Sequence, residues 1–345
     1  MVIGVVSTGG QLFRAAVGFE FSDPALEAVA GATLAEVEDV LRDAAVSADP
    51  VVTEAARHLV DAGGKRFRPL LVTVAASFGD ARAPKVVLAG AVVELTHLAT
   101  LYHDDVMDES LVRRGAPSAN ARWGNSVAIL VGDYLFARAA HIGADLGVDA
   151  VRLHAGTFSR LVQGQIAETI GPRPGEDETE HYLRVISEKT ASLIETSTRL
   201  GGLFGGVEPH HVECLARYGE TIGVAFQLSD DLLDIASDGL QSGKTPGTDL
   251  REGVRTLPML YALASEDASP SAQRLREILA GGPVADDALH AEALGLLRES
   301  AALKRARETV REHAERARLA LAPLPDLPAR RALEHLSDFI VDRTC

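Results

Sequence analysis

The chain has 345 residues, of which 46% are hydrophobic and 24% are charged, a composition typical of a globular protein with a substantial core. Its formal net charge of -15 argues against nonspecific nucleic-acid binding, which requires a basic surface. Aromatic residues contribute only 5%, which favours helix over sheet. The two cysteines, Cys214 and Cys345, have neither disulfide-framework nor metal-ligand spacing, so we expect a protein of the reducing cytoplasm.

The N-terminal part of the chain carries clear helix signals. Residues 1–21 lack the basic start of a signal peptide, and we expect a loose segment there. Asp23-Pro24 and Asp49-Pro50 each place a capping side chain before a proline, which predicts that helices begin at these prolines. Further helices are predicted over residues 69–78 and 84–107. No apolar run approaches the roughly 18 residues of a spanning helix, so we expect no transmembrane segment.

Beyond residue 107, the sequence predicts a loop followed by a series of helices. The loop covers residues 113–124. Helices are predicted over residues 125–146, 150–170, 178–204, 209–235, 284–297, 302–321 and 328–341. Strand-like alternation is nearly absent, and no linker divides the chain. We therefore predict a single all-α domain spanning residues 1–345, with ligand groups facing inward from its core helices.

Two copies of one acidic pattern, Asp-Asp-x-x-Asp, lie inside apolar helical stretches at residues 104–108 and 230–234. In a helix, positions i, i+1 and i+4 fall within an arc of about 100°, so three carboxylates crowd one face. Such like charges repel one another, and a site of carboxylate oxygens suits Mg²⁺. A single copy is more often a solvated helix face. Two copies favour a magnesium cluster between two helices that binds a diphosphate.

Basic residues occupy the turn between two predicted helices, where Gly63 and Gly64 precede Lys65, Arg66 and Arg68. The simplest interpretation is a basic helix C-terminus, since cations interact favourably with the helix dipole there. The alternative is a diphosphate cradle. Glycine lets the backbone approach a ligand closely, and arginine offers paired donors to phosphate oxygens.

Further polar residues lie close to the acidic motifs in sequence. Arg113 and Arg114 either balance the charge of the acidic helix end or bind a ligand. His97 lies seven residues before the first motif, about 20° away on the same helical stripe, so it is either a core histidine or a diphosphate contact. Gln227 shares the stripe of the second motif. Lys189-Thr190 lies mid-helix, where an exposed lysine is the simpler interpretation and a buried one would need an anionic partner.

Taken together, these motifs resemble those of the trans-isoprenyl diphosphate synthases, the polyprenyl synthetase family. The similarity is dense over residues 61–258 and looser on the flanks. The matching segments are residues 64–69, 103–108 with 113–115, 189–190, 226–234 and the Gly-Lys-x-x-Gly-x-Asp-Leu loop at 243–250. One departure is Gly164-Gln165, because many long-chain relatives have glutamate directly after the glycine, whereas here the acid comes later, at Glu168. The resemblance implies a large all-α helical bundle and a homodimer.

The resemblance also implies roles for individual residues. About three Mg²⁺ ions would bind the six motif aspartates Asp104, Asp105, Asp108, Asp230, Asp231 and Asp234. The allylic diphosphate would contact Arg113, Lys189 and Lys244, with Thr190 and Gln227 nearby. Isopentenyl diphosphate would bind Lys65, Arg68, His97 and Arg114. The implied reaction joins isopentenyl diphosphate to the allylic primer, and residues 237–255 would form a lid that brings in Lys244.

Product length depends, in this family, on residues that lie before the first motif. Members that make C15 or C20 products commonly have a bulky aromatic four or five residues before the first aspartate, where this chain has Thr100 and Ala99. Thr96 lies about one turn further along the helix. These small residues resemble those of long-chain synthases. We therefore expect a product of about C35–C50 from a C15 or C20 primer, with a transient membrane contact when the product leaves.

Three alternatives stay open at this point. A short-chain synthase would use the same site to make C15–C20 products. A class I terpene cyclase usually keeps one aspartate-rich motif and lacks the basic turn, whereas this chain has both motifs together with Lys65 and Arg68. One subunit of a heteromeric synthase would need a partner for activity, although non-catalytic subunits tend to lose the acidic motifs that are intact here.

Overall fold

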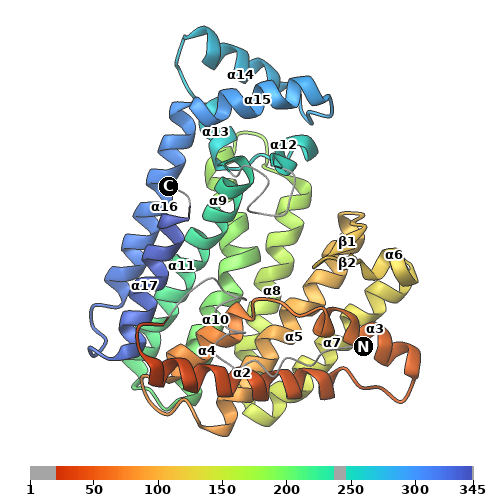
Figure 1. Cartoon of the computed structure of the whole chain (residues 1–345), viewed down its shortest axis with the longest axis vertical. Helices are drawn as coiled ribbons and strands as arrows, with labels where there is room; N and C mark the ends of the chain where they lie inside the picture. Colours follow the sequence, from red (N-terminus) through yellow and green to blue (C-terminus); the bar gives the residue numbers. More distant parts are fainter. Residues whose placement is uncertain (1–20, 237–245, 344–345) are drawn as a thin grey trace. The chain divides into compact units, whose positions relative to one another are not determined.

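The computed structural model describes residues 21–236 and 246–343, which are almost entirely helical (Figure 1). The all-α prediction is therefore confirmed. The chain folds into two compact units, each built from separate stretches of sequence. The first comprises the chain up to Ser159 with Leu193–Gly219 and Pro323–Leu333, and the second comprises Arg160–Ser192, Glu220–Ala322 and the chain from Glu334 onwards. A single domain over residues 1–345 stays a prediction, and residues 1–20 of the expected loose segment lie outside the described residues.

The first unit contains the N-terminal helices and a short hairpin. Its complete elements are α2 (Pro24–Ala44), α3 (Pro50–Asp61), α4 (Phe67–Ala76), α5 (Pro84–Met107), β1 (Val112–Arg113), β2 (Ala116–Pro117), α6 (Ala119–Trp123) and α7 (Asn125–Leu146). Most of α10 (Ser192–Phe204) and the first part of α8 (Val148–Ile170) also belong to it. Helix α5 packs against α2, α4 and α7 (Figure 1). Its apolar sequence suits this central position, and the first acidic motif stands at its C-terminal end.

The second unit contains the elements of the second acidic motif. Its complete elements are α9 (Glu178–Ile186), a π-helical turn η1 (Ser187–Ala191), α12 (Thr248–Glu252), α13 (Leu257–Leu263), α14 (Pro270–Ala280), α15 (Asp287–Glu299) and α16 (Ala301–Ala320). The C-terminal half of α11 (Pro209–Ala236), which carries the motif, and the end of α17 (Pro328–Asp342) complete it. Helix α13 packs against α16, α14 and α9.

The helix starts that the sequence predicted are confirmed where a cap and a proline mark them. The carboxylate of Asp23 accepts a hydrogen bond from the Leu26 amide at 2.8 Å, and that of Asp49 accepts one from the Val51 amide at 2.8 Å. Each satisfies a backbone donor that the first helical turn leaves without a partner. The predicted bounds 84–107 and 125–146 agree with α5 and α7.

The stretch predicted as a loop at residues 113–124 contains regular structure instead. Strands β1 and β2 pair antiparallel, with Val112 opposite Pro117, and α6 follows them. The two turn residues, Arg114 and Gly115, have φ values of 53° and 76°. Positive φ at both positions is the geometry of the tightest hairpin turns. Gly115 adopts it readily, whereas an arginine at the first turn position is not a sequence signal for such a turn.

The helix predicted over residues 178–204 is interrupted by the π-helical turn η1. Gly164 of α8 lies against this turn. A Cβ atom at Gly164 would lie 2.6 Å from the backbone nitrogen of Lys189, so α8 and the π-helical turn approach more closely than any side chain would allow. Such turns widen a helix locally and are frequent at functional sites. The predicted start at Pro69 also moves, since α4 begins at Phe67.

Two helices of the described chain, α5 and α7, are long and apolar enough to cross a membrane by length and composition alone. The expectation that no apolar stretch is long enough to span a membrane therefore does not hold when helices are judged by length and composition. In α5, 67% of the apolar window is buried inside the protein, as in the core helix of a globular protein. In α7 the buried share is 39%, which leaves an apolar face of this helix on the surface.

Gly201 of α10 provides a test of the packing in the first unit. A Cβ atom there would lie 2.9 Å from both the carbonyl carbon of Val72 and the Cβ of Ala75 on α4. We expect Gly201→Ala to lower the free energy of unfolding by about 2 kcal/mol, because the backbones must separate. The control is Gly143→Ala in α7, where a Cβ has no atom within 4 Å; it should be neutral or stabilising by up to about 1 kcal/mol. Equal urea midpoints for the two variants would contradict this packing.

Candidate active site

The first acidic motif occupies the last turn of α5, where the helix dipole disfavours negative charge. Asp105 is fully buried, and its Oδ1 accepts hydrogen bonds from Arg113 at 2.6 Å. Burial raises the pKa of this carboxyl group, and Arg113 opposes that effect. Asp104 is partly exposed and Asp108 is exposed. The motif therefore has one anchored carboxylate at its centre and two that reach the surface.

The hairpin that follows the motif carries both of its arginines into the site. While Arg113 binds Asp105, Arg114 donates to the carbonyl oxygen of Leu59 at 2.9 Å and also to that of Gly63. The guanidinium of Arg114 lies so close to Gly64 that a Cβ there would be 2.7 Å from its Cζ. The structure thus brings Arg114 against the basic turn, as the isopentenyl diphosphate prediction requires.

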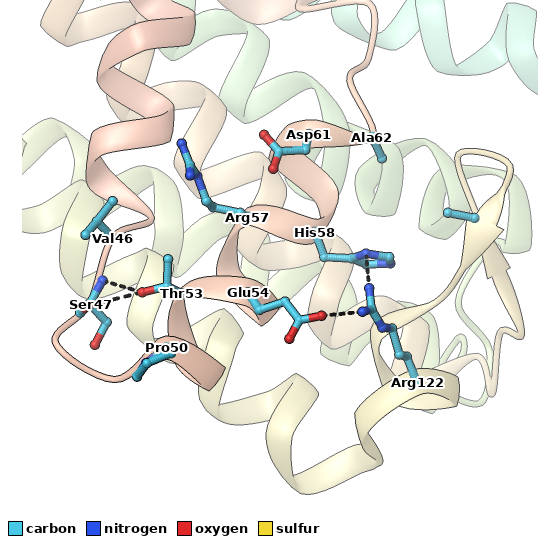
Figure 2. A pocket seen from close by; sticks show the side chains of 11 residues that line it. Val46, Ser47, Pro50, Thr53, Glu54, Arg57, His58, Asp61, Ala62 and Arg122 are labelled. Atoms are coloured by element: carbon cyan, nitrogen blue, oxygen red, sulfur yellow. Dashed lines mark hydrogen bonds and ion pairs between the residues drawn. The ribbon is translucent and has the colours of Figure 1, made fainter. Parts of the chain in front are cut away.

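A groove of about 770 Å³ on the outer face of α3 explains how the hairpin is held (Figure 2). Arg122 of α6 forms an ion pair with Glu54 of α3, and it stacks over the Trp123 ring at 4.2 Å. The His58 ring nitrogen Nε2 lies 2.8 Å from the carbonyl oxygen of Pro117. None of the predicted site residues lines this groove. Its contacts instead attach α6 and the end of the hairpin to α3.

Two of the three cations of the basic turn, Lys65 and Arg68, have no ion-pair partner in the part of the chain that the structure describes. Among the described residues, neither Lys65 nor Arg68 has a side-chain hydrogen-bond or ion-pair partner, and Nε of Arg68 is buried without one. Burial lowers the pKa of Arg68 to about 10, so it stays charged at neutral pH. Burial, then the charges of Arg68 and Arg114, lower the pKa of His97 well below its usual value. His97 is therefore a neutral donor or acceptor beside unsatisfied cations.

The second acidic motif is anchored at its centre in a comparable way. Oδ1 of Asp231 accepts a hydrogen bond from Gln227 at 2.8 Å, and Oδ2 accepts one from the phenol of Tyr182. Gln227 in turn accepts from the Thr190 hydroxyl at 3.1 Å. Burial raises the pKa of Asp231 to about 7, against the effect of these donors. Thr190 and Gln227 are thus brought to the motif, and Tyr182 is a site residue that sequence reasoning missed.

The flanking aspartates of the second motif have different partners. Asp234 accepts hydrogen bonds from the backbone amides of Thr248 and Asp249 at 3.2 and 3.1 Å, which satisfies the first donors of α12. Asp230 is exposed, and its Oδ1 lies 2.7 Å from the guanidinium of Arg343, just after α17. The described part of the predicted lid is therefore tied to the motif through Asp234.

Lys189 lies in the π-helical turn and forms an ion pair with Glu168 of α8. Sequence reasoning assigned Glu168 no role, yet it is the anionic partner that a mid-helix lysine requires. Arg160 of α8 binds Glu188 of the same turn at 3.0 Å, so two ion pairs join α8 to this turn. Lys244 and residues 237–245 of the predicted lid lie outside the described residues.

The three predicted chain-length residues differ in their surroundings. Ala99 is fully buried, and Thr100 is partly buried with its hydroxyl bonded to the carbonyl oxygen of His97 at 2.8 Å. The hydroxyl of Thr96 is fully buried, 2.7 Å from the carbonyl oxygen of Val92 and 2.8 Å from Nε2 of His154 on α8. Burial lowers the pKa of His154, so this histidine is neutral. No sequence pattern pointed to His154.

The donor chemistry of both motifs fits Mg²⁺. Within the described part of the chain, no group of three acidic or histidine side chains converges as a complete metal cage. Each motif instead presents carboxylates at the surface, Asp104 and Asp108 in the first and Asp230 in the second. Mg²⁺ is typically bound by one or two carboxylates together with water and substrate phosphates, so this arrangement suits it.

Comparison with known proteins places these motifs in a family. A model of the family described as polyprenyl synthetase matches residues 49–296, which include both acidic motifs and the basic turn. The chain belongs to the polyprenyl synthetase family. A nonaprenyl diphosphate synthase of Mycobacterium tuberculosis is 52% identical over 94% of this chain and 97% of its own length. The resemblance of the motifs to this family, and an enzymatic role as a prenyltransferase, are thereby confirmed.

Solved structures of the family share the fold. A geranylgeranyl pyrophosphate synthase from Corynebacterium glutamicum, crystallised with calcium and isoprenyl diphosphate, aligns with a TM-score of 0.85 at 44% identity, over 94% of this chain and 99% of that one. A decaprenyl diphosphate synthase from Rhodobacter capsulatus aligns with a TM-score of 0.84 at 36% identity, over 93% of this chain and 99% of that one. The roles of individual residues stay predictions.

Tyr182 allows a test of the second motif through its pH dependence. Its phenol stabilises the charged form of Asp231, so Tyr182→Phe should raise the pKa of that carboxyl group further above 7. Protons then compete more strongly with metal at neutral pH. We expect the Mg²⁺ concentration for half-maximal activity at pH 7 to rise about threefold to tenfold, and the difference to shrink near pH ~8.5.

The matched control for this test is Tyr261→Phe. The Tyr261 hydroxyl lies 3.1 Å from that of Thr309, in the same unit but away from the motif. Its Mg²⁺ requirement should follow the parent enzyme at every pH. A Tyr182→Phe enzyme whose Mg²⁺ requirement also matches the parent at pH 7 would rule out this role of the phenol.

Proposed function

We propose that this enzyme condenses isopentenyl diphosphate with an allylic diphosphate primer, head to tail, to give a long-chain all-trans polyprenyl diphosphate of about C35–C50. The observation that carries the proposal is the basic turn of the first unit. Lys65 and Arg68 have no protein partner among the described residues, and they lie with Arg114 and neutral His97 in the unit that also presents Asp104 and Asp108. The cations of the basic turn can bind one anionic substrate directly. The carboxylates of the first motif can bind a second anionic substrate through metal ions.

Isopentenyl diphosphate would bind the cations of the basic turn. Arg68 and Arg114 offer paired donors to phosphate oxygens, while Lys65 adds a mobile point charge at the surface. Neutral His97 would donate or accept one hydrogen bond without adding repulsion to the arginines. This assignment leaves Arg113 with Asp105, next to the exposed carboxylates, for the allylic diphosphate.

The allylic diphosphate would lie against the two acidic motifs. About three Mg²⁺ ions held by the six motif aspartates, Asp104, Asp105, Asp108, Asp230, Asp231 and Asp234, would stabilise the charge that develops on the leaving diphosphate. Arg113, Lys189, Thr190 and Gln227, together with Lys244, would contact the same group. The ion pair between Lys189 and Glu168 then means that this lysine must exchange a carboxylate for a phosphate on binding.

The reaction requires no protein base. The C–O bond to the allylic diphosphate breaks, and the double bond of isopentenyl diphosphate attacks the resulting cation. A proton is lost from the adjacent carbon, and the departing diphosphate accepts it. The lowered pKa of His97 makes this histidine a weak base, which fits the scheme. The protein must exclude water from the cation, and residues 237–255 are the proposed lid.

The length of the product is proposed from α5 and from the relatives. A nonaprenyl synthase is 52% identical, but a geranylgeranyl synthase of known structure is 44% identical, so overall identity supports a long chain without deciding it. Ala99 and Thr100, with Thr96 beyond them, are the small residues of α5 where a bulky side chain would stop a growing chain. The short-chain alternative would require another residue to close this path.

We further propose a cytoplasmic homodimer that contacts membranes only when it releases product. The exposed side of α7 and the start of α8 supports the dimer, since Ile129, Leu130, Val148 and Val151 are all exposed there. Ile129 and Leu130 lie near the start of α7, and Val148 and Val151 follow its end, so the exposed apolar residues are spread along the length of the helix. Exposed apolar surface of this kind suits a protein interface. A C15 or C20 allylic diphosphate is the proposed primer.

The main test is an incubation of the purified chain alone with Mg²⁺, labelled isopentenyl diphosphate and primers of ten, fifteen or twenty carbons. We expect a ladder ending at about C35–C50, because the substrate sites and metal ligands are intact. Failure to elongate any primer would contradict the proposed function. Activity that appears only on adding a second protein would favour the heteromeric alternative, and cyclised hydrocarbons would favour a terpene cyclase.

The proposed path of the growing chain is tested by Ala99→Phe and Thr100→Phe. Each adds an aromatic ring on the face of α5 below the first motif, so the product should shorten to about C15–C20. Chromatography of dephosphorylated products measures this directly. Ala291→Phe, at an exposed alanine of α15, is the control and should leave the ladder unchanged. Unchanged length in both α5 variants would show that the chain takes another path.

A further inference from the structure

Arg66 lies between the two proposed substrate ligands of the basic turn, yet its guanidinium is used entirely by the protein. It forms an ion pair with Glu38 of α2, and Nη1 donates to Oε1 of Glu94 on α5 at 3.0 Å. It also donates to the carbonyl oxygens of Val60 at 2.9 Å and Gly63 at 3.3 Å. Arg66 is therefore a structural pin that joins α2, α5 and the end of α3, in contrast to its neighbours Lys65 and Arg68.

The backbone at Arg66 requires such a pin. Its φ is 47°, in the left-handed region that a non-glycine residue adopts only at a cost of about 1 kcal/mol or more. At this residue the chain turns into α4, and the Arg66 carbonyl accepts the Leu70 amide at 3.0 Å. Lys65 and Arg68 lie one residue before and two residues after it. The directions in which their side chains leave the backbone thus depend on the conformation that the guanidinium of Arg66 holds.

Glu94 is the shared counter-ion of the arginines around the basic turn. It is only 1% exposed, and its Oε1 lies 3.0 Å from Nη1 of Arg66 and 4.0 Å from Nη2 of Arg114. Its charge raises the pKa of Arg68, whereas burial and Arg114 lower it. One buried carboxylate therefore offsets the mutual repulsion of three arginines. Without it, these cations would repel one another without compensation in a poorly solvated environment, and we expect them to separate.

We propose that Glu94, acting through Arg66 and supported by Glu38, is the positioning residue that holds the basic turn in the geometry that binds isopentenyl diphosphate. The inference rests on the proposed function, because it takes Lys65, Arg68 and Arg114 as ligands of that substrate. Glu94 itself does not touch the substrate. It keeps Arg66 out of the phosphate site and keeps Arg68 and Arg114 close together, so that two guanidinium groups converge on one diphosphate.

This role predicts an effect on one substrate and not on the other. In Glu94→Gln the side chain keeps its size and loses its charge, so Arg66 and Arg114 lose their shared counter-ion. We expect the KM for isopentenyl diphosphate to rise on the order of 10- to 100-fold. The KM for the allylic primer should change less than about twofold, because that substrate is assigned to other residues. Glu94→Asp keeps the charge and should recover part of the loss.

The experiment measures both KM values and kcat for the full-length enzyme with Mg²⁺, together with melting temperatures. Glu195→Gln is the matched control, since Glu195 is nearly buried and paired with Arg199 at 2.6 Å but lies on α10. It should leave the ratio of the two KM values unchanged. Equal rises in both KM values of Glu94→Gln, or no rise at all, would overturn the positioning role.

Arg68→Gln separates this inference from the proposed function. If Arg68→Gln raises the KM for isopentenyl diphosphate and Glu94→Gln does not, the positioning role fails while the site stands. If Arg68→Gln has no effect, the assignment of the substrate to the basic turn fails first. Should Glu94→Gln not fold, Glu38→Gln decides, because the Glu38 side chain is 24% exposed. We expect a rise of about threefold there, and an unchanged KM would overturn the role.

Discussion

A carboxylate removed from water needs donors, and the two acidic motifs are built around this requirement. Arg113 binds Oδ1 of Asp105, whose Oδ2 is buried without a partner among the described residues, and Gln227 and Tyr182 bind the two oxygens of Asp231. Leaving either carboxylate buried without these donors would cost several kcal/mol, on the order of the whole stability of a domain. The β1–β2 hairpin places Arg113 beside Asp105, and α9 places Tyr182 beside Asp231. The central aspartate of each motif is thereby fixed, while flanking carboxylates reach the surface.

The basic turn follows the same rule with the charges reversed. Arg66 is buried, and two glutamates and two carbonyl oxygens satisfy it, whereas Lys65 and Arg68 are left with unsatisfied donors among the described residues. Of the three cations within these four residues, Arg66 therefore stabilises the turn. Lys65 and Arg68 are left to bind an anion. A site for two diphosphates has to be stable without them, and internal counter-ions such as Glu94 make this possible while leaving the outward donors open.

Much of the fold followed from local sequence signals, and the site followed from its motifs. Asp23, Asp49 and the prolines behind them mark helix starts by chemistry that acts within one turn, which is why α2 and α3 were predictable. The helix is interrupted at Lys189 where it contacts Gly164, which lies 25 residues earlier in the printed sequence and meets it only in the folded chain. Tyr182 and Glu94 escaped prediction for the same reason. Their partners are distant in sequence, so no periodicity or spacing reveals them.

The fold itself carries little information on product length, since synthases named for short and for long products superpose on this chain almost equally well. The difference must therefore lie in a few side chains along the path of the growing product. On α5 the proposed side chains are small, and Ala99 is fully buried, so a bulkier residue there would have to displace its neighbours. Below it, the hydroxyl of Thr96 is joined to His154 of α8. A neutral, hydrogen-bonded pair of this kind joins two helices without placing a charge beside the proposed path of the product, so α8 as well as α5 would border that path.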